Sequence, residues 1–136
     1  MAQVSGRCLC GKIHYTSDGE VRMAAVCHCK SCQLESGSAF AVLVAIDRNT
    51  LRIEGDTPKS FTRLGGSGKP MTNYFCGNCG TSISHESANS PNLVFIPAGT
   101  LDDPSWVKPN AHIWCEEKQP WVTIPEGVPQ FPRNPG

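Results

Sequence analysis

The pattern of hydrophobic and polar positions along the chain predicts a protein built mostly from short β-strands. Residues 39–46, "AFAVLVAI", form a continuous apolar run of strand length, which indicates a strand covered on both faces. Residues 7–16, "RCLCGKIHYT", alternate enough to predict another strand, on which Cys8 and Cys10 would point to the same side. This first part of the chain therefore favours a β-rich fold.

Two later stretches predict strands joined by turns. Residues 51–55 and 59–65 are separated by the turn signal "DTP" at 56–58, which predicts that the two segments pair as a hairpin. Residues 73–84, "NYFCGNCGTSIS", predict a strand that enters a glycine-rich turn and a second strand that leaves it. That turn contains two cysteines.

The remaining segments predict two more strands, one short helix and an extended tail. Strands are expected at residues 92–99 and 111–116, and the helix at residues 30–36. The proline-rich segment from about 119 to 136 predicts an extended chain that runs over the surface. Because no second composition regime interrupts the sequence, we expect a single domain over residues 1–136.

Charge and hydropathy count against a nucleic-acid or membrane partner. Lys plus Arg total 12 and Asp plus Glu total 12, so no net field attracts phosphates or an anionic lipid surface. The N-terminal sequence has no basic start followed by an apolar run, and no apolar stretch approaches the roughly 20 residues of a membrane span. We therefore expect a soluble, cytoplasmic protein that binds neither nucleic acid nor membrane.

The eight cysteines are the strongest chemical signal in the sequence. In the reducing cytosol, clustered cysteines are more often metal ligands or catalytic groups than disulfide partners. All but Cys115 fall in three groups: Cys8 with Cys10, Cys27 with Cys29 and Cys32, and Cys76 with Cys79. A structural zinc ion has four ligands, and only the two pairs together supply four from intact groups.

The two pairs predict a closed, structural zinc site. Gly11 and Gly80 directly follow the pairs, and glycine at such positions lets backbone N–H groups turn toward the sulfurs and neutralise thiolate charge. The site would join the N-terminal strand to a turn far along the chain. Such a crosslink stabilises a small sheet protein.

The group Cys27, Cys29 and Cys32 predicts a second zinc site of another kind. Cys27 and Cys29 share a face if this segment is extended, and Cys32 returns to that face if a helical turn begins near Lys30. Zinc with three protein ligands and one open position is typical of catalytic sites. Because three thiolates leave the centre anionic, bound water would be acidified little, so the sequence favours a thiol substrate as the incoming ligand.

A fourth protein ligand would make the second site structural as well. The residues able to supply one are Cys115, His14, His28, His85 and His112. The position of His28 between two ligands favours a supporting or surface role, and Cys115 after an apolar segment is most simply a buried free cysteine.

Several motifs, taken together, resemble the glutathione-dependent formaldehyde-activating family, which includes centromere protein V. The motifs are "GRCLCGKIHY", "CHCKSCQLESGSAF", "YFCGNCGTSIS", "HIW", "KQPW" and "GVPQF". The resemblance implies a mainly β, beta-tent fold of small antiparallel sheets with zinc-ribbon-like metal sites. It also implies two zinc ions per chain, a structural one on Cys8, Cys10, Cys76 and Cys79 and a catalytic one on Cys27, Cys29 and Cys32.

The same resemblance implies a carbon–sulfur lyase that joins or splits a thiol–aldehyde adduct such as S-hydroxymethylglutathione. An anionic thiol such as glutathione needs nearby cations, and the candidates are Lys30, Arg22, Arg48, Arg63 and Lys69. In the family the segment at 37–40 lines the catalytic pocket, so Phe40 is expected either to stack against the substrate or to pack in the core. The candidates for proton transfer are His28, His112 and Glu35.

Two other functions fit the same residues. An open metal position would equally serve a hydrolase or lyase acting on an imine or on another thiol adduct. A zinc-stapled binding module without catalysis is the second alternative. The balanced charge and the lack of a basic strand face with aromatic residues count against nucleic acid as its ligand.

Overall fold

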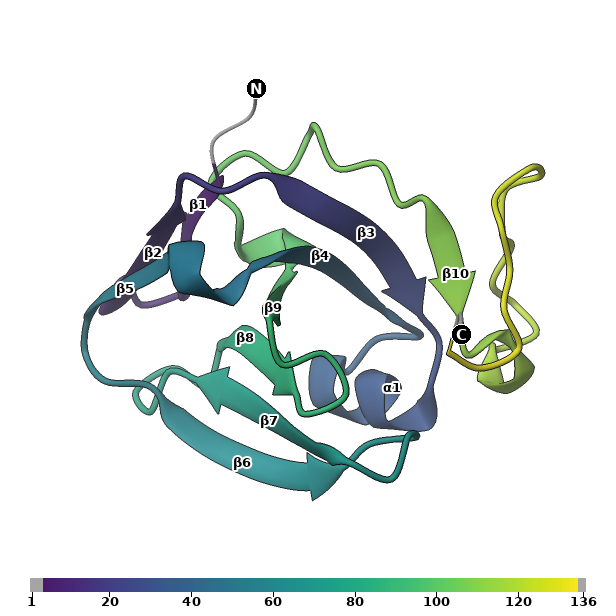
Figure 1. Ribbon diagram of the computed structural model, residues 1–136, viewed down its shortest axis with the longest axis horizontal. Helices are drawn as coiled ribbons and strands as arrows, with labels where there is room; N and C mark the ends of the chain where they lie inside the picture. Colours follow the sequence, from purple (N-terminus) through teal and green to yellow (C-terminus); the bar gives the residue numbers. More distant parts are fainter. Residues whose placement is uncertain (1–3, 135–136) are drawn as a thin grey trace.

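The computed structural model describes residues 4–134, and within this range it confirms a mainly β fold with two sheets and one short α-helix (Figure 1). The smaller sheet has three antiparallel strands in the order β1 (Val4–Arg7), β2 (Ile13–Ser17) and β5 (Leu51–Gly55). Together with the larger sheet it forms the beta-tent arrangement that the family resemblance implied.

The larger sheet has seven strands and bends around the helix α1 (Lys30–Ser36). In the order of pairing, its strands are β10 (Ala111–Ile113), β3 (Val21–Cys27), β4 (Ala41–Asp47), β9 (Leu93–Pro97), β8 (Ser82–Ser87), β7 (Pro70–Phe75) and β6 (Lys59–Leu64). Neighbouring strands are antiparallel, except that β10 runs parallel to β3. Figure 1 shows β3 and β4 on one side of α1 and β6 and β7 on the other. Helix α1, which carries Cys32, thus lies between the two ends of the larger sheet.

Aliphatic side chains from the central strands form the hydrophobic core. Val44, Ala45 and Ile46 of β4 are buried in succession, as the apolar run predicted. Ile13 of β2 and Ile96 of β9 belong to the same core cluster as Val44 and Ile46. Burial of each large aliphatic side chain stabilises the fold by about 1.5–3 kcal/mol. The core therefore fixes the small sheet against the larger one.

The predicted hairpin between residues 51–55 and 59–65 is wrong, although both strands exist. Strand β5 pairs with β2 and strand β6 pairs with β7, so the turn between them connects the two sheets. Gly55 has a φ of 95°, and a Cβ there would collide with the carbonyl oxygen of Lys12. Asp56 N donates a hydrogen bond to the same oxygen at 2.9 Å. These long-range contacts direct the chain away from a hairpin.

The predicted strand over residues 7–16 is in fact two strands with a turn between them. Strand β1 ends and β2 begins within this stretch. Gly11, with a φ of 80°, closes the turn by donating from its N–H to the carbonyl oxygen of Cys8 at 3.2 Å. Cys8 and Cys10 therefore lie in a turn rather than on one face of a strand, because glycine at positive φ reverses the chain here.

Other local predictions are confirmed. The helix covers residues 30–36, and β7 and β8 enter and leave the glycine-rich turn. Strand β10 ends earlier than predicted because Trp114 adopts the left-handed conformation, with a φ of 56°. Short 3-10 helices occur after β4, β9 and β10: η1 (Arg48–Thr50), η2 (Ala98–Thr100) and η3 (Cys115–Glu117).

The segment after η3 is held against β10 by its backbone. His112 N donates to the carbonyl oxygen of Pro129, and Phe131 N donates to the carbonyl oxygen of His112, both at 2.9 Å. Residues 1–3 and 135–136 lie outside the described range, and the single domain over 1–136 with a tail from about 119 stays a prediction. In the described residues, none of the helices combines the length and apolar character that a membrane crossing needs.

Candidate metal centres and the adjoining cavity

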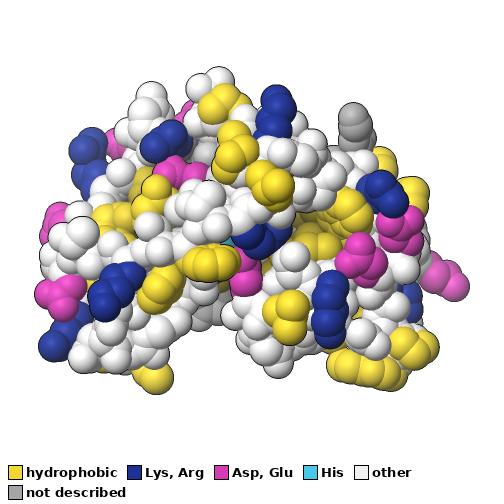
Figure 2. Space-filling model, turned by 90° about the horizontal axis from the view of Figure 1, so that it is seen from below, with side chains coloured by type: hydrophobic (Ala, Val, Ile, Leu, Met, Phe, Trp, Pro, Cys, Tyr) yellow, Lys and Arg dark blue, Asp and Glu magenta, His cyan; other side chains and the backbone are white. Residues whose placement is uncertain are grey.

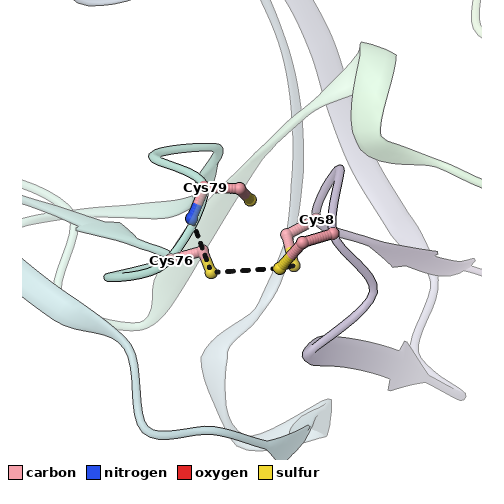
Figure 3. Close-up of side chains that lie close together, drawn as sticks. Cys8, Cys76 and Cys79 are labelled. Atoms are coloured by element: carbon pink, nitrogen blue, oxygen red, sulfur yellow. Dashed lines mark hydrogen bonds between the residues drawn. The ribbon is translucent and has the colours of Figure 1, made fainter.

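The two cysteine pairs converge where the two sheets meet (Figure 3). Cys8 and Cys10 lie in the turn between β1 and β2, and Cys76 and Cys79 lie in the turn between β7 and β8. The four sulfurs are all within 4.8 Å of one another. The Sγ atoms of Cys8 and Cys10 are 3.6 Å apart, and those of Cys10 and Cys76 are 3.8 Å apart. The structure thus brings the first predicted ligand set together.

These distances fit a tetrahedral zinc ion. Four sulfurs at about 2.3 Å from zinc lie about 3.8 Å from one another. The donor set also has the composition of closed zinc sites, because all four groups are cysteines. This four-sulfur cluster could therefore hold a zinc ion without rearrangement of the chain.

Backbone N–H groups point at the sulfurs of the four-sulfur cluster, as the adjacent glycines predicted. Ile13 N donates to Cys8 Sγ at 3.3 Å, and Cys79 N donates to Cys76 Sγ at 3.5 Å. Hydrogen bonds from Thr81 lower the pKa of Cys79 to about 5, so this thiolate forms readily at neutral pH. Donors directed at sulfur stabilise thiolate ligands.

The other three clustered cysteines come together at the start of α1. Cys27 ends β3, Cys29 is the N-cap residue of α1, and Cys32 lies in the first turn of the helix. Their sulfurs are all within 4.8 Å of one another. Cys29 has an extended backbone, and its Sγ accepts a hydrogen bond from Cys32 N at 3.3 Å. An extended segment followed at once by a helical turn is the geometry that the sequence predicted.

The hydrogen bonds among the three thiols of this three-sulfur cluster oppose their simultaneous ionisation. Hydrogen bonds from Cys27 and then Cys32 lower the pKa of Cys29. The hydrogen bond with Cys29 raises the pKa of Cys27, and hydrogen bonds with Cys27 and Cys29 raise the pKa of Cys32. Metal ligation removes this conflict, because it favours the deprotonated form of each thiol. The donor set therefore fits a thiolate-binding ion such as zinc.

In residues 4–134, no fourth Cys, His, Asp or Glu places a ligand atom within 4.8 Å of all three sulfurs. Cys115 is half-buried in η3, and its Sγ donates to the carbonyl oxygen of His112 at 3.4 Å. His14 is exposed on β2. The fourth protein ligands considered from the sequence therefore do not join the three-sulfur cluster.

His28 is fully buried rather than at the surface. Its Nε2 lies 2.9 Å from Nδ1 of His112 on β10, and the two rings are stacked with centroids 5.2 Å apart. Burial lowers the pKa of both imidazoles. The pair joins the start of α1 to β10, and neither histidine lines the cavity described next. Their positions count against the proton-transfer role considered for them.

A cavity of about 500 Å³ adjoins the three-sulfur cluster at Cys32. Its walls come from α1, β4, β6, β7, β8, β9 and η2, and include Phe40, as the family resemblance implied. Of the predicted cations, Arg63 lines the cavity, whereas the others lie elsewhere: Arg22, Lys30, Arg48 and Lys69. Figure 2 shows a histidine side chain, nearly covered, between basic and acidic side chains in the middle of the face seen from below.

Glu35, Arg63 and His85 form a polar network in the cavity wall. Arg63 Nε donates to Glu35 Oε1 at 3.3 Å, and Glu35 Oε2 lies 3.6 Å from His85 Nδ1. Burial lowers the pKa of His85; the Glu35 carboxylate opposes this shift, and the Arg63 guanidinium adds to it. Sequence reasoning named His85 only as a zinc ligand. The one signal in the sequence for a functional role of His85 is its position in β8, the strand that follows the turn with Cys76 and Cys79.

Comparisons with known proteins gave matches in sequence and in structure. A family model described as "Glutathione-dependent formaldehyde-activating enzyme" matches residues 3–117. An uncharacterized lyase of Schizosaccharomyces pombe is 28% identical over 98 residues, which cover 72% of this chain and 68% of that protein. The crystal structure of a Rhodobacter sphaeroides protein aligns with a TM-score of 0.56 over 77% of this chain and 91% of that chain, at 20% identity. At that identity, the structural match shows the fold alone.

Proposed function

Because the chain belongs to the glutathione-dependent formaldehyde-activating enzyme family, we propose that it is a zinc-dependent carbon–sulfur lyase acting on a thiol–aldehyde adduct. The adduct class is a small S-hydroxymethyl thiol such as S-hydroxymethylglutathione. The name of the fission-yeast relative, a lyase, supports the reaction class. The observation that carries the proposal is the three-sulfur cluster at the wall of the cavity.

In this proposal the two clusters have different roles. Cys8, Cys10, Cys76 and Cys79 hold a structural zinc ion, and Cys27, Cys29 and Cys32 hold a catalytic one. Support for this division comes from the cavity, which is lined by Cys32 of the second set. A zinc ion on three thiolates supplies a binding position for one more sulfur and favours the thiolate form of that sulfur.

The residues of the cavity bind and orient the adduct. A volume of about 500 Å³ lies within the range of roughly 300–1,000 Å³ that is usual for small-molecule sites. Phe40 and Met71 supply apolar wall, and the guanidinium of Arg63, which Glu35 contacts through Nε, supplies further N–H donors for a carboxylate on the thiol partner. The cavity therefore favours a small, anionic thiol adduct as substrate.

We propose small molecules, and neither nucleic acid nor membrane, as the partners of this protein. Basic and acidic side chains are interspersed on the face that Figure 2 shows. That face therefore lacks the extended positive surface on which phosphate binding depends. The cytoplasmic location belongs to the same proposal and rests on the sequence.

The test is a rate measurement on zinc-loaded protein. Glutathione and formaldehyde are mixed to form S-hydroxymethylglutathione, and exchange between adduct and free formaldehyde is followed by NMR with and without the protein. We expect accelerated exchange and close to two zinc ions per chain by elemental analysis. Cys115→Ser serves as the control, because Cys115 lies outside both clusters, and it should behave as the wild type. No acceleration by a protein that holds two zinc ions would overturn the proposed activity.

A further inference from the structure

We propose that His85 is the catalytic group that accepts and returns the hydroxyl proton of the adduct, and that Glu35 and Arg63 are positioning residues that hold its imidazole. This inference rests on the proposed function and adds the group that moves the proton. It assigns proton transfer to a residue of the cavity wall, whereas the candidates from the sequence were His28, His112 and Glu35.

The lining of the cavity leaves His85 as the group suited to this task. Four of its lining residues carry titratable side chains: Cys32, Glu35, Arg63 and His85. Cys32 belongs to the three-sulfur cluster, and Glu35 is already paired with Arg63. An arginine stays protonated in proteins and cannot act as a base. Imidazole is also the side chain most often used for general acid–base catalysis near neutral pH.

The contacts of the network orient the imidazole. Glu35 Oε2 faces His85 Nδ1 at 3.6 Å, while Arg63 Nε holds the other carboxylate oxygen at 3.3 Å. A carboxylate beside Nδ1 favours the tautomer with hydrogen on Nδ1, which leaves the lone pair on Nε2 to accept a proton. The separation of 3.6 Å is longer than a hydrogen bond, and such catalytic contacts often shorten only when substrate binds.

Burial of His85 favours its neutral form, against the opposing effect of the Glu35 carboxylate. Its strand neighbours, Asn73 on β7 and Phe95 on β9, are uncharged. The charged groups that act on it are Glu35 from α1 and Arg63 from β6. Burial is the largest effect and lowers the pKa of His85 below its usual value of about 6.5. The imidazole is therefore available as a base at pH 7.

The proposed step balances without any further reactant. In the direction of cleavage, Nε2 of His85 accepts the proton of the adduct hydroxyl and the O–H bond breaks. The freed electron pair forms the carbonyl bond of the aldehyde, and the carbon–sulfur bond breaks with its electron pair remaining on the thiolate. In the reverse direction, the thiolate attacks the aldehyde carbon and the imidazolium returns its proton to the oxygen.

The kinetic test compares His85→Gln with the wild type across pH, again with S-hydroxymethylglutathione. The wild type should lose kcat as pH falls through the lowered pKa of His85. His85→Gln should lose kcat by about 10²- to 10⁴-fold and should lose this pH dependence, with KM and zinc content unchanged. His14→Gln is the matched control, because His14 is exposed on β2. An unchanged kcat and pH profile in His85→Gln would overturn the inference and leave the lyase proposal intact.

Two further variants give a signed test that holds even if His85→Gln does not fold. The Glu35 carboxylate raises the pKa of His85 and the Arg63 guanidinium lowers it. In Glu35→Gln the midpoint of the imidazole titration should therefore move to lower pH, and in Arg63→Gln to higher pH. Long-range ¹H–¹⁵N NMR of the imidazole reads these midpoints, and the Nδ1–H tautomer, without any enzymatic assay. Equal midpoints in all three proteins, or hydrogen on Nε2, would overturn the inference.

The two proposals can fail separately. Wild-type protein with two zinc ions and no effect on the adduct would refute the lyase activity, whatever the NMR titration shows. Wild-type activity together with an unaltered His85→Gln variant would refute only the role of His85.

Discussion

The two cysteine clusters use similar short motifs, but the protein assembles them in different ways. The four-sulfur cluster takes two ligands from a turn of the small sheet and two from a turn of the larger sheet, and Cys10 and Cys76 are 66 positions apart in the chain. The three-sulfur cluster comes from one continuous segment, residues 27–32, and lies against a cavity. Ligands from distant segments crosslink the fold. Ligands from one segment add little crosslinking, and in the proposed function the metal that they hold is reached from the cavity at Cys32.

Removal of a ligand from the four-sulfur cluster should have the largest effect. In Cys76→Ala we expect loss of zinc from this site and an unfolded protein at 25 °C. Structural zinc in zinc-finger peptides contributes about 10–16 kcal/mol, which is as large as the whole stability of an ordinary domain, about 5–15 kcal/mol. Far-UV circular dichroism measures the loss of folded structure, and elemental analysis measures the loss of zinc. A cooperative melt at the wild-type temperature would contradict the structural role of this cluster.

Removal of Cys29 should abolish turnover but leave most of the fold. Its Sγ also caps α1, so Cys29→Ala should lose about 1 kcal/mol of stability through the missing cap. Cys29→Ser keeps an acceptor at the N-cap and should be more stable than Cys29→Ala, yet equally inactive. Denaturant titration and the adduct assay separate these effects. If Cys29→Ala unfolds as Cys76→Ala does, the three-sulfur cluster is structural as well.

Alanine substitutions at two glycines should have the smallest effects on stability and should still distinguish the two clusters by their zinc release. Gly80, beside the four-sulfur cluster, and Gly37, at the end of α1, have φ values of 81° and 68°, and a Cβ at either would meet open space. Alanine at each should therefore cost only backbone strain, about 1–2 kcal/mol. Chelator competition followed by zinc analysis should show easier release from the four-sulfur cluster in Gly80→Ala, and from the three-sulfur cluster, whose Cys32 lies on the same short helix as the cap, in Gly37→Ala.

Gly127→Ala is the control for this pair, because Gly127 also has a positive φ, 82°, with open space around it. It should lower stability without changing zinc release. Easier release of both zinc ions from Gly80→Ala and from Gly37→Ala, with release from Gly127→Ala unchanged, would show that the two sites are thermodynamically coupled and not separate.

Local signals in the sequence were sufficient for the cysteine groups and for the helix. The change from extended chain to helix at Cys29 depends on neighbouring residues, and α1 begins at Lys30 as predicted. The apolar run of β4 is equally local, because its burial follows from its own composition. These features need no knowledge of distant contacts.

The features that the sequence could not predict depend on contacts between distant segments. A turn signal favours a hairpin, but the pairing of β5 with β2 depends on contacts of Gly55 and Asp56 with Lys12. The network of Glu35, Arg63 and His85 joins three elements whose residues have no shared motif. For that reason the proton-transfer candidates from the sequence omitted His85.

The spacing of the four-sulfur cluster also sets an order of events during synthesis of the chain. The ribosome releases Cys8 and Cys10 long before Cys76 and Cys79, so the set of four ligands cannot be complete until the second turn emerges. Loop closure over such a distance is entropically costly and precedes any gain from the metal. In the proposed zinc-bound protein, closure of this long loop should therefore limit how quickly a newly made chain matures, even when the finished site binds the ion tightly.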